Sequence, residues 1–351
     1  MGSKESAPGP ATAGESGAEP APGATGPLRQ AAVHANRFIG TALATYHFNE
    51  PRYQLTAARN FNSITPENEM KWESIEPGPG NFSFTAGDEL VAFAQQNGMR
   101  FRGHTLVWHS QLAPWVKSLS GAELHAAMLR HIQRVAGRYK GKIAQWDVVN
   151  EAIADGDSGQ LRPDSPWTAL GPSFIDDAFR AAHEADPNAL LFYNDYNTEK
   201  PGTAKTDAVY NLVKHLKEIG VPISGVGFQM HVDPREGLTG AEIRQNFERF
   251  AALGLLIEIT ELDIPVGEVP GNAEEKLKAQ KTIAHDIVAA CVAVARCSGV
   301  TVWGFMDEHS WLNQPRWAAL RGRMPHYPLP FDSAYSPKPF YQGMVDALEG
   351  R

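Results

Sequence analysis

Eight short apolar segments alternate with helix-like segments along this chain, and this alternation restricts the fold more than any other feature. Apolar residues recur at helical spacing between them, as in Val209, Val213 and Leu216 before Gly220. Eight strands in alternation with helices predict a single α/β domain, a (β/α)8 TIM barrel. The strands are expected over residues 38–42, 61–65, 100–107, 144–149, 189–193, 225–229, 255–260 and 300–303.

An open, doubly wound sheet is the alternative for such a chain. Many of these sheets bind a dinucleotide through a glycine-rich turn after the first strand. Here the first predicted strand, FIGTA, is followed by LATYHFNE, which lacks that turn. The barrel is therefore favoured.

Residues 1–27 differ in composition from the rest of the chain. They are rich in Ala, Gly, Pro, Ser and Glu and contain no aromatic residue, so they cannot bury enough apolar surface to fold. We predict a disordered linker or tail over 1–27 and a barrel catalytic domain over 28–351. The segment lacks the apolar core of a signal peptide, so we expect the export signal to have been lost upstream.

Overall composition excludes some classes of partner. The formal net charge of -8 argues against a nucleic-acid-binding protein, and 42% hydrophobic residues fit a globular domain with a sizeable core. No apolar stretch approaches the length of a membrane span. The acidic balance is consistent with a neutral polymer as substrate, and we expect the protein to act as a monomer.

The two cysteines, Cys291 and Cys297, are six residues apart. Within one continuous helix they would lie about 9 Å apart along the axis, too far for a disulfide. If the helix ends near Arg296, with Ser298 and Gly299 as breakers, the chain can fold back and close the bond. Two buried free thiols are the other possibility, and the spacing does not decide between them.

Two predicted strands end in a glutamate. The stretch QWDVVNE ends in Asn150 and Glu151, and LLIEITELD contains Glu261 and ends in Asp263. The C-terminal ends of all strands in a barrel open onto the same face, so the two carboxylates are expected to face each other. Carboxylate pairs of this kind cleave glycosidic bonds.

The other strand ends are rich in residues that suit sugars. Tryptophans offer flat surfaces to the apolar faces of sugar rings, and amide, Lys, His and Glu side chains bond their hydroxyl groups. The chain has no Walker loop, HExxH or CxxC motif, so we expect no metal and no cofactor. The candidates at strand ends are Glu67, Asn68, Lys71, Trp72, His104, Trp108, His109, Gln229, His231, Trp303 and Trp311.

Several motifs, in order, resemble glycoside hydrolase family 10, the endo-1,4-β-xylanases. The resemblance extends from Leu28 to the C-terminus, and it implies a secreted or periplasmic enzyme that acts on xylan and xylo-oligosaccharides. The motifs that carry it are ENEMKW, RGHTLVWHSQL, WDVVNEAI, NDYN, GFQMH, ITELD and TVWGF, followed by a Ser-Trp pair, PFD and YSPKPFY.

The resemblance implies roles for individual residues. Glu151 matches the general acid/base and Glu261 the nucleophile, with His231 and Asp263 in support, and Asn150 matches the residue that bonds the sugar 2-hydroxyl. Cys291 and Cys297 match a family disulfide. Tyr196 and Asn197 match the aglycone side. The residues that match the glycone subsites are Glu67, Asn68, Lys71, His104, Trp108, Gln111, Gln229, Trp303 and Trp311.

A retaining double displacement follows from such a pair, whose carboxyl groups lie about 5–5.5 Å apart. A cellulase on the same barrel and a non-catalytic carbohydrate-binding barrel are the alternatives, and we expect Lys71 and Trp311 to leave no room for the hydroxymethyl group of glucose. The chain departs from the family in Met230, where a smaller residue is common. It also departs in a longer loop between Trp311 and Pro328, which carries Gln314, Pro315, Arg316 and Trp317.

Overall fold

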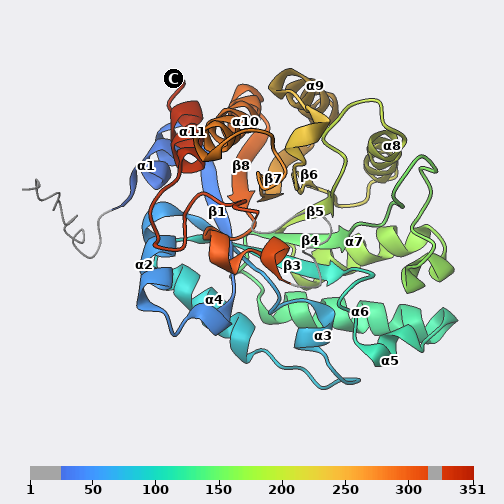
Figure 1. The fold of residues 1–351 in the computed structure, drawn as a ribbon. Helices are drawn as coiled ribbons and strands as arrows, with labels where there is room; N and C mark the ends of the chain where they lie inside the picture. The colour runs from blue at the N-terminus through green and yellow to red at the C-terminus, as the bar shows by residue number, and fades with distance from the viewer. Residues whose placement is uncertain (1–24, 315–325) are drawn as a thin grey trace, which may run out of the picture.

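The computed structural model describes residues 25–314 and 326–351 and contains a closed barrel of eight parallel strands, β1 to β8, in sequence order. Helices surround the barrel (Figure 1), so the predicted TIM barrel is confirmed. The strands are Phe38–Leu43, Ser63–Pro66, Arg100–Val107, Gln145–Asn150, Leu190–Asp195, Gly225–Phe228, Leu256–Leu262 and Cys297–Val302.

Nearly every residue of these strands is buried, which agrees with their apolar sequences and with a parallel sheet covered on both faces. Gly40 in β1 pairs with Ser63 in β2 and with Thr301 in β8, which closes the ring. Close packing also requires Gly103 in β3, since a Cβ atom there would lie 2.2 Å from the ring of Trp146 in β4.

The outer helices turn their apolar residues toward the barrel. In α6, Leu124, Met128, Ile132 and Val135 are all buried, as the helical spacing predicts. The longer helices are α1 Pro27–His34, α2 Pro51–Asn60, α4 Thr85–Gln96, α6 Gly121–Arg138, α7 Ser173–Ala185, α8 Ala204–Glu218, α9 Gly240–Ala251, α10 Ala273–Ala293 and α11 Pro339–Leu348. Single turns form α3 Trp72–Ile75 and α5 Pro114–Lys117.

Short 3₁₀ turns η1 to η5 lie in the loops, at Thr45–His47, Pro166–Leu170, Pro234–Glu236, Asp307–His309 and Trp311–Asn313. Helix α1 begins at Pro27, one residue before the predicted start of the barrel domain. It joins the two ends of the domain, because the Leu28 amide donates to the Tyr341 hydroxyl of α11 at 3.0 Å. None of the described helices is long and apolar enough to cross a membrane.

The start of β8 differs from its prediction. The strand begins at Cys297, not at residue 300, and α10 ends at Ala293, before Arg296. Ser298 and Gly299 therefore lie inside a strand and do not act as helix breakers. Gly299 is needed there for packing, since a Cβ atom would lie 2.5 Å from the Phe38 side chain of β1.

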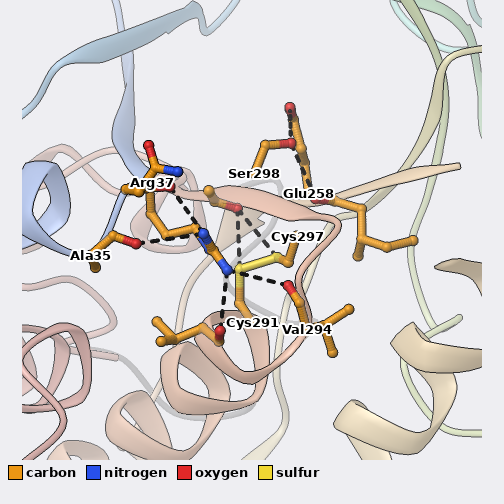
Figure 2. Close-up of a disulfide and its surroundings, with 11 residues drawn as sticks. Ala35, Arg37, Glu258, Cys291, Val294, Cys297 and Ser298 are labelled. Atoms are coloured by element: carbon orange, nitrogen blue, oxygen red, sulfur yellow. Dashed lines mark hydrogen bonds between the residues drawn. A yellow bond between two sulfur atoms is a disulfide. The ribbon is translucent and has the colours of Figure 1, made fainter.

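Cys291 of α10 and Cys297 of β8 form a disulfide with an S–S distance of 1.99 Å and a Cα–Cα distance of 5.3 Å. Both cysteines are fully buried, and the bond between them excludes the free-thiol alternative in this structure. Figure 2 shows Arg37 beside the bond, where its guanidinium donates to the Val294 carbonyl at 3.3 Å. The disulfide thus ties an outer helix to the N-terminal end of a barrel strand.

Two predictions lie wholly or mainly outside the described residues. The linker was predicted over residues 1–27, of which residues 1–24 are not described. Pro315, Arg316 and Trp317 belong to the undescribed segment 315–325. Met230, the other departure from the family, is buried with φ of 66°, and its amide donates to the Glu199 carboxylate at 2.9 Å.

Candidate active site

A cavity of about 500 Å³ opens at the C-terminal ends of the strands. Fifteen of the sixteen predicted catalytic and sugar-binding residues line it, and Asp263 lies behind His231. Trp72 is wrongly placed among the strand-end candidates, because its buried ring stacks on His131 at a centroid distance of 3.6 Å. The remaining lining residues are His109, Ser110, Asp155, Glu236 and Gln314.

Glu261, at the end of β7, is held by donors on both carboxylate oxygens. Asn194 Nδ2 donates to Oε1 at 2.9 Å, and His231 Nε2 lies 3.1 Å from Oε2. His231 Nδ1 lies 2.7 Å from Asp263, which also accepts from Trp311 Nε1 at 2.8 Å. The ring is thereby fixed between two carboxylates.

The charges of this group follow from its neighbours. Burial acts to lower the pKa of His231, but Asp263 and Glu261 outweigh it and raise the pKa to about 10. Burial acts to raise the pKa of Glu261, but the hydrogen bond from His231 and the charge of His104 outweigh it and lower the pKa. A carboxylate beside an imidazolium is therefore the stable state.

Glu151 follows β4 directly in left-handed backbone, with φ of 56°. One carboxylate oxygen accepts from Asn150 Nδ2 at 3.2 Å and from Gln229 Nε2 at 2.9 Å. The other accepts from Trp108 Nε1 at 2.7 Å. All three donors are neutral, whereas Glu261 has a cationic partner, so the two carboxylates lie in different electrostatic environments.

Asn194, at the C-terminal end of β5, connects the two glutamates. Its Nδ2 donates to Asn150 Oδ1 at 2.8 Å as well as to Glu261, and its Oδ1 accepts from Thr260 Oγ1 at 2.7 Å. The sequence gives only a weak signal for this residue, a polar side chain at a strand end within NDYN. It was not among the predicted site residues.

Lys71 organises one wall of the cavity. Its ammonium donates to Asn68 Oδ1 at 3.1 Å and to Gln111 Oε1 at 2.8 Å, and it lies 5.0 Å from the ring centroid of Trp108. Burial raises the pKa of Glu67 to about 7, which the charge of Lys71 only partly offsets. This wall thus offers amides, a cation and aromatic faces together.

Buried charges inside the barrel support His104, whose Nδ1 lies 2.9 Å from Asp147. Asp147 also accepts from Arg102 Nε at 2.9 Å, and the same guanidinium donates to Glu258 at 2.6 Å. This group was not predicted, because charged residues within an apolar strand carry no local sign that they pair across a barrel.

One group among the described residues could place three metal-ligand atoms close together: His47, Glu50 and His309. The two imidazole rings stack at a centroid distance of 3.5 Å with an interplanar angle of 11°. A metal ion lies near the plane of each imidazole that binds it, and two stacked parallel rings share no such plane. The group also contains neither glutamate of the pair, so it does not bear on their chemistry.

Comparison with known proteins agrees with this geometry. The sequence model described as Glycosyl hydrolase family 10 matches residues 27–347. The chain is 40% identical over 330 residues to Endo-1,4-beta-xylanase B of Thermotoga neapolitana, which covers 92% of both chains. It is 41% identical over 320 residues to Beta-1,4-xylanase of Dictyoglomus thermophilum, covering 88% of this chain and 87% of that protein.

Solved structures agree as well. Native xylanase 10B of Thermotoga maritima superposes with a TM-score of 0.85 at 42% identity, over 92% of this chain and 98% of that one. Xylanase 10B of Thermotoga petrophila RKU-1, solved in complex with xylobiose, gives the same TM-score and identity, over 97% of its own chain. On the family match and these relatives, the chain belongs to glycosyl hydrolase family 10.

Proposed function

We propose that this protein is a retaining endo-1,4-β-xylanase, which hydrolyses internal β-1,4-xylosidic bonds of xylan. The observation that carries the proposal is the pair Glu151 and Glu261, which line one cavity and are joined through Asn150 and Asn194. The relatives named as xylanases, and the xylobiose complex of one of them, support xylan as the substrate class.

The first half of the reaction transfers the sugar to the protein. Glu261, as carboxylate, attacks the anomeric carbon, while Glu151 gives its proton to the leaving glycosidic oxygen. A bond forms between Glu261 and the sugar, the glycosidic bond breaks, and Glu151 is left as a carboxylate. The lowered pKa of Glu261 keeps it ionised and ready to attack.

The second half releases the sugar. Glu151 now accepts a proton from a water molecule, whose oxygen attacks the anomeric carbon and displaces Glu261. Glu151 is then protonated again and Glu261 is again a free carboxylate. The anomeric configuration is retained. These steps require no metal or organic cofactor.

The surrounding residues position the substrate in this proposal. Asn150 bonds the 2-hydroxyl of the sugar at the cleaved bond, while His231 and Asp263 hold Glu261. Tyr196 and Asn197 bind the aglycone side. The glycone side is bound by Glu67, Asn68, Lys71, His104, Trp108, Gln111, Gln229, Trp303 and Trp311.

We also propose that residues 28–351 act as a monomeric catalytic domain outside the cytoplasm, secreted or periplasmic, with residues 1–27 as a linker or tail. A disulfide persists in oxidising compartments, and Cys291–Cys297 is consistent with such a location. All residues given roles in the reaction come from one chain, which is consistent with a monomer.

The test compares wild type with Glu261→Ala on xylan and on carboxymethylcellulose, with product analysis and proton NMR of the first anomer released. We expect short xylo-oligosaccharides of retained configuration from the wild type, and a loss of at least about 10⁴-fold in the variant. Glu248→Ala is the matched control, because this exposed glutamate pairs with Arg244 on the surface of α9 and does not line the cavity.

Other outcomes would replace the proposal. Hydrolysis of carboxymethylcellulose but not xylan would make the protein a β-1,4-glucanase. Binding of xylan without turnover by the wild type would make it a non-catalytic carbohydrate-binding barrel. Inverted product would exclude the double displacement.

A further inference from the structure

Arg162 lies in the loop after β4 and has no role in the mechanism so far. The loop folds back on itself, because the Arg162 amide donates to the Ala152 carbonyl at 2.8 Å and Ile153 bridges to Leu161. Arg162 is only 8% exposed and does not line the cavity. Its guanidinium therefore acts on protein groups and does not contact substrate.

The first of these groups is the backbone of Glu151. Arg162 Nε donates to the Glu151 carbonyl at 3.1 Å, and the Glu151 amide donates to the Asn194 carbonyl at 2.9 Å. Glu151 has left-handed backbone, which is unfavourable for a non-glycine residue and persists only where the surroundings hold it. The next amide, of Ala152, donates to the Tyr193 hydroxyl at 3.1 Å, so Arg162 supplies one of three hydrogen bonds that hold the backbone on the two sides of Glu151.

The second group is the hydroxyl of Tyr196, to which Arg162 Nη2 donates at 2.9 Å. The same hydroxyl donates to Asp155 at 2.5 Å, and Asp155 lies 3.3 Å from Arg162 Nη1. Lys205 completes the cluster, since its ammonium lies 3.0 Å from Asp155 and 3.6 Å from the centroid of the Tyr196 ring. Tyr196 is thereby fixed at its hydroxyl and over one face.

From these contacts we infer that Arg162 is a positioning residue, which holds Glu151 and Tyr196 as one unit and so places the acid/base against the leaving oxygen. The inference rests on the proposed acid/base role of Glu151. A proton donor must lie within hydrogen-bond reach of the leaving oxygen, so the position of the Glu151 carboxyl group affects the rate. A displacement of that group by about 1 Å can lower the rate about 100-fold. Without the guanidinium of Arg162, the carbonyl of Glu151 loses its side-chain donor.

The experiment compares Arg162→Met, Arg162→Lys and wild type on aryl β-xylobiosides that differ only in the leaving group. Phenol needs a proton to leave and 2,4-dinitrophenol does not, and neither places a sugar over Tyr196. We expect Arg162→Met to lower kcat/KM about 30- to 100-fold for the phenyl glycoside and less than about threefold for the dinitrophenyl glycoside. Arg162→Lys keeps the positive charge but cannot donate to Glu151 and Tyr196 together, so its kcat/KM for the phenyl glycoside should fall between those of wild type and Arg162→Met.

Arg249→Met is the matched control. Arg249 donates to Asp207 at 2.6 Å and lies 4.0 Å from the ring centroid of Tyr210, a similar arrangement of cation, carboxylate and tyrosine on helices α8 and α9. It does not contact Glu151, so its loss should leave the ratio of the two kcat/KM values at the wild-type level. A purely structural effect of losing an arginine would change both substrates equally.

Glu151→Ala separates failure of this inference from failure of the proposed function. If Glu151 is the acid, this variant shows a larger leaving-group dependence than Arg162→Met. If Glu151→Ala slows both glycosides equally, the acid/base assignment itself is wrong. The remaining case is that Glu151→Ala affects the phenyl glycoside more than the dinitrophenyl glycoside, but the Arg162 variants do not. If these variants lower kcat/KM equally for both glycosides, or leave it unchanged, Arg162 has no positioning role.

Discussion

The imidazole of His231 lies 3.1 Å from the carboxylate of Glu261, and its pKa of about 10 keeps it charged over the acidic and neutral range. The proposed nucleophile is thus always paired with a cation until strongly alkaline pH. Because a carboxyl group must be ionised to attack, we expect this pair to determine the lowest pH at which the protein acts if Glu261 is the nucleophile.

We therefore expect His231→Asn to move the acidic limb of the kcat/KM profile upward by about one pH unit or more. An asparagine removes the positive charge, and loss of an opposite charge nearby raises the pKa of a carboxyl group by about 1–3 units. The measurement is a pH profile with an aryl xylobioside. The control is His285→Asn, which changes a partly exposed imidazole paired with Asp286 on α10.

An unchanged acidic limb in His231→Asn would show that the imidazolium does not set the charge of Glu261. A fall in activity at all pH values would not be enough to support the prediction. The shift itself is the required result.

Glu67 gives a second prediction, on stability. Its pKa of about 7 lies above the ordinary value of 4.5 because the side chain is buried. The native state then binds this proton more tightly than the unfolded state, so the free energy of unfolding falls as pH rises from about 4.5 to about 7. The loss for this one group is up to about 3 kcal/mol.

Denaturant unfolding of wild type and Glu67→Gln from pH 4.5 to 8 measures this effect. The glutamine has no charge to bury, so we expect the stability of wild type relative to the variant to fall by up to about 3 kcal/mol over that range. Glu248→Gln, at an exposed position of α9, should show no such trend. A constant difference between wild type and Glu67→Gln would contradict the raised pKa.

Removal of the disulfide should lower stability and leave activity intact. The bond closes a loop with a sequence separation of 6 residues, for which loop-closure entropy predicts a contribution of about 2 kcal/mol. The double variant Cys291→Ala/Cys297→Ala should lose about this much in denaturant unfolding, with kcat/KM unchanged at 25 °C. The bond lies at the N-terminal end of β8, away from the cavity.

Dithiothreitol provides the control for the disulfide. It should lower the stability of wild type toward that of the double variant and leave the double variant unaffected. Equal sensitivity of both proteins to dithiothreitol would mean that the bond is not the source of the difference.

Trp311 is expected to limit the size of the sugar. Its Nε1 donates to Asp263 at 2.8 Å and its side chain lines the cavity, where we expect it to leave too little space for a hydroxymethyl group. We predict that Trp311→Ala raises the ratio of kcat/KM for aryl cellobioside over aryl xylobioside about tenfold or more. The ratio is the measurement, because it does not depend on the amount of folded protein.

Trp115→Ala is the matched control for Trp311→Ala. Trp115 is also partly buried and donates through Nε1, to the Glu76 carbonyl at 3.1 Å, but it does not line the cavity. Its ratio should equal that of wild type. If Trp311→Ala also leaves the ratio unchanged, sugar size is limited by other residues.

The barrel and the glutamate pair were predictable because their signals are local. A run such as QWDVVNE carries both its burial and its terminal carboxylate within seven residues. The predicted start of β8 was wrong because the local sequence favours a different structure there. Ser298 and Gly299 favour a break in any isolated segment, and only the neighbouring Phe38 explains why a glycine belongs inside β8.

Other contacts between distant parts of the chain were not predictable. Arg162 contacts Glu151 and Tyr196 through a folded loop, and Asn194 reaches Glu261 from another strand. Trp72 shows the opposite error. It follows site residues in the motif ENEMKW, but its ring turns to His131 of α6, which the sequence order does not reveal.

The amide of Asn194 has a consequence for how such a protein can change over evolutionary time. Its short side chain extends from β5 and bonds both Asn150, the last residue of β4, and Glu261 of β7. It therefore links three strands at the C-terminal end of the barrel. Loops around the cavity can accept insertions and new side chains without disturbing that link. We therefore expect changes in the loops to alter substrate preference while the relative position of Glu151 and Glu261 is kept by the strands.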